Sequence, residues 1–164
     1  MLDTATRRLT LAQQSILTDE IRREIGYQTE PIIIEVDKTL LRLFTQAVGD
    51  INPLWTDDAE ARKGPYGGII APPSLLCSSM ATSYNLPYAH IPALQPMRRL
   101  DGGGEWEFYR PIRLGDTITA TASLHDMTEK RGRLGPMVIV TSEITWHNQR
   151  QALVARAYTT AIRY

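Results

Sequence analysis

The feature that most constrains the fold of this chain is a change of hydrophobic period near residue 104. Four later stretches alternate apolar and polar residues and are rich in β-branched residues: 104–109, 117–124, 137–146 and 152–162. Such alternation indicates strands with one buried face. Turns between them are expected at 115–116, 131–133 and 148–150. Helical patterns followed by consecutive strands predict an α+β domain with an antiparallel sheet.

The first hundred residues predict mainly helices. Apolar residues fall near helical spacing over 11–25, 38–48 and 74–84, and a β-branched run at 32–36 predicts one strand. The third helix follows two prolines and is apolar all round, so we expect it to be buried. The remaining expected features are a possible N-cap at Thr18, a cap at Asp37, a helix stop at Gly49, a short helix through Arg62 capped by the acidic pair 57–58, and a proline-rich connection at 85–97.

The composition is that of one globular domain. Hydrophobic residues make up 43% of the 164 residues, and Lys plus Arg equal Asp plus Glu at 18 each, which gives no sign of nucleic-acid binding. No apolar run follows the N-terminal arginines, so neither a signal peptide nor a membrane span is expected. We expect residues 1–17 to be an N-terminal extension and 18–164 a single domain.

The lone cysteine, Cys77, cannot form an intramolecular disulfide, and no group of Cys and His has the spacing of a metal site. Its apolar neighbours predict a buried thiol rather than a reactive one. A cytoplasmic location is therefore the expectation.

Two motifs carry a resemblance to a known family. Residues 49–53 read G-D-I-N-P, and residues 67–73 read G-G-I-I-A-P-P. Taken alone, the first motif is a helix stop followed by an Asx-Pro turn. At this spacing the two motifs together resemble MaoC-like (R)-specific enoyl-thioester hydratases and the N-terminal, fatty-acid-synthase-type (FAS1-like) dehydratase domain. The resemblance extends over residues 18–163, since 105–111 and 114–116 are similar to the sheet half of that family.

The resemblance implies a hot-dog fold, in which a curved antiparallel β-sheet wraps around a long central helix. It also implies a dimer, formed with a catalytic MaoC-like chain or with a second copy, and an acyl thioester carried on coenzyme A or acyl carrier protein, with no further cofactor. In catalytic members an Asp and a His five residues apart activate the water that adds to an enoyl thioester. A backbone N–H at the start of the central helix stabilises the enolate that develops.

The chain departs from that pattern at two positions. Asp50 matches the family aspartate, but Trp55 stands where the histidine is expected, and an indole N–H cannot accept a proton. Pro73 stands at the enolate-binding glycine and has no backbone N–H. Losing one such donor typically costs about 100- to 1000-fold in rate. We therefore expect the isolated chain to lack hydratase activity.

The residues predicted to contact the acyl thioester come from the two motifs: Asn52, Trp55, Gly67, Gly68, Ile70, Ala71 and Pro73. Trp55 either fills the space that the histidine leaves or lines an acyl tunnel. The three histidines, at 90, 125 and 147, are expected at surfaces or turns, and the basic stretches 98–99 and 129–133 are either solvated surface or contacts for coenzyme A phosphates.

These observations predict an acyl-thioester-binding, non-catalytic subunit of a MaoC-like enoyl-CoA hydratase or 3-hydroxyacyl dehydratase complex. Two alternatives stay open. One is a self-sufficient hydratase or dehydratase that uses Asp50, and the other is a non-enzymatic acyl-CoA-binding or scaffolding homodimer.

Overall fold

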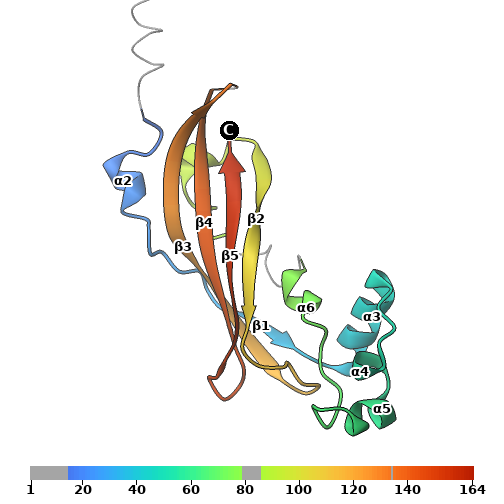
Figure 1. Ribbon diagram of the computed structural model, residues 1–164. Helices are drawn as coiled ribbons and strands as arrows, with labels where there is room; N and C mark the ends of the chain where they lie inside the picture. Colours follow the sequence, from blue (N-terminus) through green and yellow to red (C-terminus); the bar gives the residue numbers. More distant parts are fainter. Residues whose placement is uncertain (1–14, 79–85, 134) are drawn as a thin grey trace, which may run out of the picture.

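A computed structural model describes residues 15–78, 86–133 and 135–164. Five antiparallel strands form one sheet in the order β1-β3-β4-β5-β2, as predicted for an α+β domain. Figure 1 shows a tall curved sheet with α3, α4 and α5 gathered beside its lower end. The strands are β1 (Ile32–Glu35), β2 (Arg99–Phe108), β3 (Thr117–Gly132), β4 (Gly135–His147) and β5 (Leu153–Arg163). The helices are α2 (Asp19–Arg22), α3 (Lys38–Val48), α4 (Pro53–Thr56), α5 (Asp58–Lys63), α6 (Ser74–Cys77) and the 3-10 helix η1 (Pro92–Leu94).

The central strands follow the predicted alternation. Every second residue of β4 from Val138 to Trp146 is buried. β3 continues beyond residue 124, where the predicted strand ends. A bulge between Leu124 and Asp126 shifts its register against β4 and interrupts the alternation on which the prediction depended. Leu124 and Met127 are consequently both buried although they are three residues apart. The turn predicted at 131–133 therefore lies slightly later, between the ends of β3 and β4.

The edge strand β2 begins at Arg99, earlier than the predicted 104. It pairs only with β5, and nearly all of its residues are exposed. A glycine is required at position 104, because a Cβ there would lie 2.8 Å from the ring of Trp106. The indole ring of Trp106 therefore packs directly over the backbone of its own strand.

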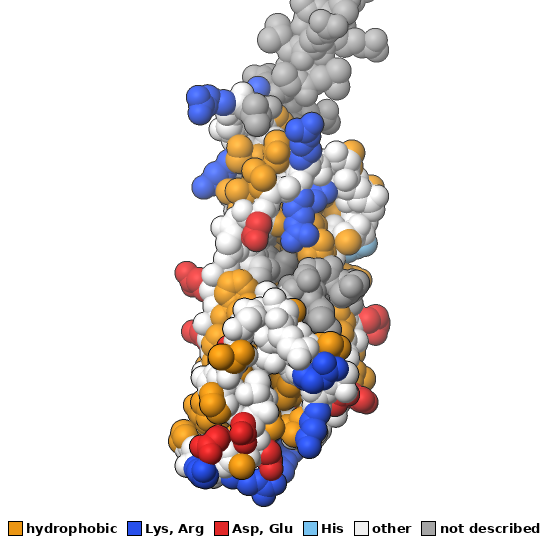
Figure 2. Space-filling model, turned by 90° about the vertical axis from the view of Figure 1, so that its right-hand side faces the viewer, with side chains coloured by type: hydrophobic (Ala, Val, Ile, Leu, Met, Phe, Trp, Pro, Cys, Tyr) orange, Lys and Arg blue, Asp and Glu red, His pale blue; other side chains and the backbone are white. Residues whose placement is uncertain are grey.

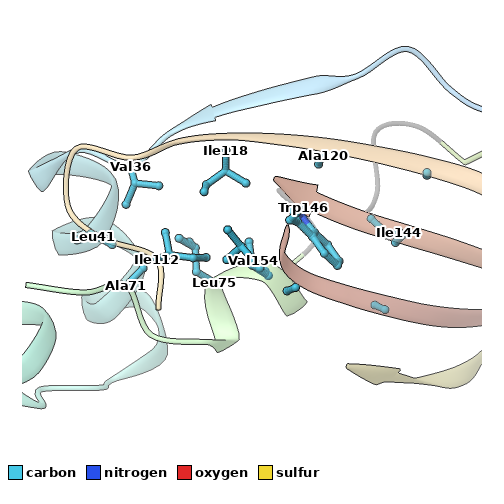
Figure 3. Packing of buried hydrophobic residues seen from close by; sticks show 14 residues of the cluster. Val36, Leu41, Ala71, Leu75, Ile112, Ile118, Ala120, Ile144, Trp146 and Val154 are labelled. Atoms are coloured by element: carbon cyan, nitrogen blue, oxygen red, sulfur yellow. The ribbon is translucent and has the colours of Figure 1, made fainter. Parts of the chain in front are cut away.

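Two hydrophobic clusters lie along the sheet. The lower cluster surrounds the fully buried Trp146 and receives Leu41 from α3 and Leu75 from α6, and Figure 3 shows side chains of helices and strands converging on this core. The upper cluster contains Leu17 and Leu94, so the segment before α2 and the proline-rich connection both pack on the sheet. Burying such apolar side chains contributes about 1.5–3 kcal/mol each.

Two helix predictions and one burial prediction need correction or limitation. Of the helix predicted at 11–25, the described part is helical only over Asp19–Arg22, whose N-cap is Thr18 as predicted; residues 11–14 lie outside the described residues. The helix predicted at 74–84 is described over Ser74–Cys77, and residues 79–85 lie outside the described part. The predicted burial of Cys77 is wrong, because its side chain is exposed.

No helix in the described ranges is long and apolar enough to cross a membrane. Within the same ranges, no group of three or more His, Cys, Asp or Glu side chains could hold a metal ion.

Candidate functional site

The end of α3 fixes the loop that carries Asp50. Gly49 has a φ of +69°, in the left-handed region that favours glycine. The backbone N–H of Asp50 then donates to the carbonyl of Thr45 at 2.9 Å. Because the chain reverses here, Asp50 lies beside the last turns of α3.

Asp50 and Asn52 both stabilise this turn. Oδ1 of Asp50 accepts a hydrogen bond from the backbone N–H of Asn52 at 3.1 Å. Oδ1 of Asn52 accepts one from the backbone N–H of Leu54 at 3.0 Å and so caps α4. The side-chain oxygen of Asn52 is therefore already engaged at the position where contact with a ligand was predicted.

Trp55 lies on α4, and its side chain is half-buried. Its indole Nε1 is buried and has no hydrogen-bond partner among the described residues. Asp50 and Trp55 line the same cavity, which has a volume of about 700 Å³. Two residues that are five positions apart in the sequence thus lie at one space, a carboxylate and an indole ring.

This cavity lies between α3, α4 and the loop before β3. Ligand sites commonly measure about 300–1,000 Å³, so its volume suits a bulky ligand. Its apolar side chains are those of Leu41, Ile51, Trp55, Ile69 and Leu114, and its polar residues are Lys38, Arg42, Thr45, Gln46, Asp50, Thr56 and Asp58. Figure 2 shows the face on which these helices lie, where hydrophobic side chains are exposed above a lower end rich in acidic and basic side chains.

The second motif is held against the loop that precedes β3. The backbone N–H of Ala71 donates to the carbonyl of Ile112 at 2.7 Å, and Ile70 forms a β-bridge with Arg113. Nη1 of Arg113 also donates to the carbonyl of Tyr66 at 2.7 Å. The glycine-rich loop is therefore attached at both of its ends.

The predicted contact residues do not share one cavity. Ile70, Ala71 and Pro73 line a separate cleft of about 260 Å³, whereas Ile69 lines the cavity of Asp50 and Trp55. Residues 69–71 thus form a wall between the two spaces. Gly67 and Gly68 are not among the described lining residues of either space, although Gly67 does adopt a φ of +68°.

No histidine is among the described lining residues of the cavity with Asp50. His90 contacts Glu24 at 2.8 Å, and the ring of His125 packs edge-on against Tyr158. His125 lies at the bulge within β3, where it is exposed, as expected for a surface histidine. His147 ends β4. Among the described residues, all three histidines thus lie away from the lining of this cavity.

Cys77 offers no substitute nucleophile. Although the side chain is exposed, neighbouring protein atoms partly desolvate it and raise the pKa of the thiol above its usual value. The thiolate, which is the reactive form, is therefore disfavoured.

Sequence reasoning missed the contribution of α3 to the cavity. Lys38, Leu41, Arg42 and Thr45 all line it and are three or four residues apart along the helix. This spacing places them on one face. The helical spacing of these residues is visible in the sequence, but only the fold shows that this face borders Asp50.

The sequence of the chain is similar to those of known proteins. The family described as "FAS1-like, dehydratase domain region" matches residues 23–157. A UPF0336 protein of Thermobifida fusca is 30% identical over 112 residues, which are 67% of this chain and 72% of that protein. A probable enoyl-CoA hydratase alpha subunit of Thermomonospora curvata is 27% identical over 73% of this chain, and the match covers 42% of that subunit.

The solved structures agree on the fold. The ChsH1-ChsH2 complex from Mycobacterium tuberculosis contains a chain that superposes with a TM-score of 0.71 at 21% identity, covering 88% of this chain and 92% of that one. MaoC-like dehydratases and (R)-hydratases superpose as well. The chain therefore belongs to the FAS1-like dehydratase family, among the MaoC-like hydratases and dehydratases, and has their hot-dog fold.

Proposed function

We propose that this chain is the acyl-thioester-binding, non-catalytic subunit of a MaoC-like enoyl-CoA hydratase or 3-hydroxyacyl dehydratase complex. The observation that carries the proposal is that Trp55 shares a cavity with Asp50 where a proton acceptor is needed. Hydration requires a base that takes a proton from water. An indole N–H cannot do so, because it is only a donor.

The cavity suits the acyl part of a thioester. Leu41, Ile69 and Leu114 give it an apolar wall, and Trp55 adds a large flat surface. Apolar ligand groups gain roughly 25 cal/mol for each Å² of surface removed from water. The role of Trp55 in this proposal is therefore to bind the acyl chain.

The cleft at Pro73 lacks what enolate stabilisation requires. Proline has no backbone N–H, so the donor that would face a developing enolate oxygen is absent at this position. Ala71 cannot replace it, because its N–H already donates to the carbonyl of Ile112. The chemistry accordingly takes place in a partner chain.

The proposed partner is a second hot-dog chain that carries an intact Asp-His pair. Support comes from the likeness to a subunit of a probable hydratase and to a chain of a two-component complex. In this chain the β2 edge has no neighbour among the described strands, and Leu100 on it is 52% exposed. An open edge with apolar side chains readily accepts another strand, so we place the partner there.

The functional test is enoyl-CoA hydration by the purified chain, alone and together with a hot-dog protein encoded by a neighbouring gene. We expect turnover only from the pair. Turnover by the chain alone that survives Trp55→Ala but is lost in Asp50→Asn would overturn the proposal in favour of a self-sufficient enzyme. Acyl-CoA binding by a chain that retains no catalytic partner in pull-downs would favour a scaffolding homodimer instead.

The site test is calorimetric titration with an acyl-pantetheine thioester. Trp55→Ala should weaken binding by about tenfold or more, since a large ring contact is lost. Leu43→Ala is the control, because Leu43 is 53% exposed on α3 and is not among the lining residues. Equal affinities for the two variants would exclude this cavity as the acyl site.

The edge test compares two matched variants by native mass spectrometry of the complex. Leu100→Asp on β2 should abolish assembly, because it introduces a charge into an apolar contact. Ile33→Asp on the opposite edge strand, where Ile33 is 65% exposed, should leave assembly intact. The reverse pattern would place the partner on β1.

A further inference from the structure

A row of polar side chains on α3 borders the larger cavity beside its apolar side chains. Lys38, Arg42 and Gln46 form this row, and all three line the cavity. They follow one another at intervals of four residues, which places them on one face of the helix. Leu41 and Thr45 form the buried row next to it. The cavity therefore has a cationic border along an apolar interior.

Helix stability does not account for the lysine in this row. Lys38 is the first residue of α3, the side chain of Asp37 caps the helix, and the first turn contains no acidic residue. The positive end of the helix dipole disfavours a cation at this position. Within the described part of the chain, the Lys38 ammonium contacts no carboxylate. A lysine here thus makes the cavity more positive at some cost to the helix.

The arginine is oriented by an uncharged neighbour. Nη1 of Arg42 donates to Oε1 of Gln46 at 3.2 Å, so the guanidinium lies along the helix. The ion pairs among the described residues join other groups, which leaves the remaining N–H groups of Arg42 for a ligand. Lys38 and Arg42, the cation pair, are about 6 Å apart along the helix axis. One carboxylate can therefore contact both of these long side chains.

The two carboxylates that line the cavity do not neutralise the cation pair. Oδ2 of Asp58 lies 2.8 Å from Nε of Arg62, with which it forms an ion pair on α5. Oδ1 of Asp50 accepts a hydrogen bond from the backbone N–H of Asn52. Asp50 lies beyond the last residue of α3 and Lys38 is the first residue, so roughly 16 Å of helix separates them. The cavity thus has a positive end and a negative end.

A ligand that is apolar throughout would match only part of this cavity. Against the cation pair it would displace water from two charged groups without offering them a partner, which is unfavourable. A carboxylate offers that partner, and repulsion from Asp50 keeps it at the opposite end. We propose that the acyl group bound in this cavity ends in a carboxylate, which the cation pair holds, while the thioester lies toward Asp50 and Trp55.

This inference rests on the proposed function, and it narrows the substrate class. The apolar side chains of Leu41, Ile69 and Leu114 contact the methylene groups between the two ends of the acyl group. The substrate is then the half-thioester of a dicarboxylic acid rather than the thioester of a simple fatty acid. The cation pair touches the end of the substrate that does not react, so its two residues determine specificity.

The test is calorimetric titration of the full chain with pairs of pantetheine thioesters that differ only at the far end. One member of each pair carries hexanedioate, octanedioate or decanedioate as the free acid, and the other carries the methyl ester of the same acid. The unchanged chain should bind the best-fitting free acid about tenfold more tightly than its ester, because two charge-assisted contacts are gained. Added salt should reduce this preference.

Variants assign the preference to the cation pair. Lys38→Gln and Arg42→Gln should each reduce the ratio of the two affinities, and the double variant should bring it to one. Arg42→Lys keeps the charge and should retain part of the preference. The controls Lys63→Gln and Arg150→Gln remove exposed cations that are not among the lining residues, so they should keep the full preference. Circular dichroism confirms that each variant is folded.

Equal affinities of the unchanged chain for acid and ester at every chain length would overturn the inference, as would a preference that survives in the double variant. Phosphopantetheine carries a phosphate but no acyl group. If the double variant binds it more weakly yet still prefers the free acid, the cation pair contacts the carrier and the inference fails. The methyl ester tests the cavity without the carboxylate. Failure of both thioesters to bind would therefore refute the acyl cavity of the proposed function itself.

Discussion

Oδ1 of Asp50 accepts a hydrogen bond from the backbone N–H of Asn52 at 3.1 Å, and this bond gives Asp50 a structural role in the turn. Asp50→Ala should lower the free energy of unfolding by about 0.5–1.5 kcal/mol, as expected for loss of one hydrogen bond. Asp50→Asn keeps an oxygen acceptor and should cost less. Urea unfolding of both variants measures the difference. In the assembled complex, hydratase turnover should survive Asp50→Asn. A turnover rate lowered by more than 100-fold would instead show that Asp50 takes part in the reaction.

The turn before Asp50 depends on glycine at position 49. Gly49→Ala should destabilise the chain by about 1 kcal/mol, because a residue with a Cβ is strained at a φ of +69°. Space is not the obstacle, since a Cβ there would meet no atom within 4 Å. Gly68→Ala is the matched control: its surroundings are equally open and its φ lies outside the left-handed region. Equal melting temperatures for the two variants would contradict this explanation.

The lower core depends on one side chain. Trp146 is 0% exposed, so Trp146→Ala should destabilise the chain by about 3–5 kcal/mol through lost burial and a residual cavity. Trp146→Phe, which keeps an aromatic ring, should cost less. Denaturant unfolding monitored by circular dichroism gives both values. A loss below about 1 kcal/mol for the alanine variant would mean that the core collapses around the missing ring.

The segment before α2 should detach from the sheet in acid. The hydroxyl of Ser15 donates to the Glu129 carboxylate, as do the backbone N–H groups of Leu17 and Ile16, and these bonds lower the pKa of Glu129. A lowered pKa in the folded state means that the stabilisation is present above the ordinary value of 4.5 and is lost as the pH falls through the folded-state pKa.

Amide NMR shifts of residues 16 and 17 should therefore titrate with a midpoint below 4.5. Glu129→Gln should remove this titration, whereas Glu60→Gln on the exposed face of α5 should leave it unchanged. A titration that persists in Glu129→Gln would assign the effect to another carboxyl group.

The strands could be predicted from the sequence wherever one face is buried, because apolar residues then recur at every second position. β4 and β5 were close to their predicted bounds, because one face of each packs on the core. The bulge at His125 breaks the alternation of β3, so the pattern ended at 124 while the strand continues. β2 exposes both faces near its start. Where neither face is buried, apolar and polar residues need not alternate, so the sequence does not indicate where the strand begins.

The site was predictable in part. Asp50 and Trp55 are close in the sequence and line one cavity, because a short turn connects them. The separation of Pro73 from that space depends on the pairing of residues 69–71 with the loop at 112–114, which only tertiary structure fixes. The helix predicted at 11–25 failed for a similar reason, since Leu17 is buried on the sheet without belonging to a helix.

The wall between the two spaces is a single extended segment of backbone. Because Ile69 lines one space and the next residue, Ile70, lines the other, a deletion or insertion of one residue in the adjoining glycine-rich loop would change the contacts offered to both spaces at once. Related chains can therefore vary the composition of this loop freely while its length stays constrained. A relative whose loop differs in length by one residue would have to reshape both spaces together.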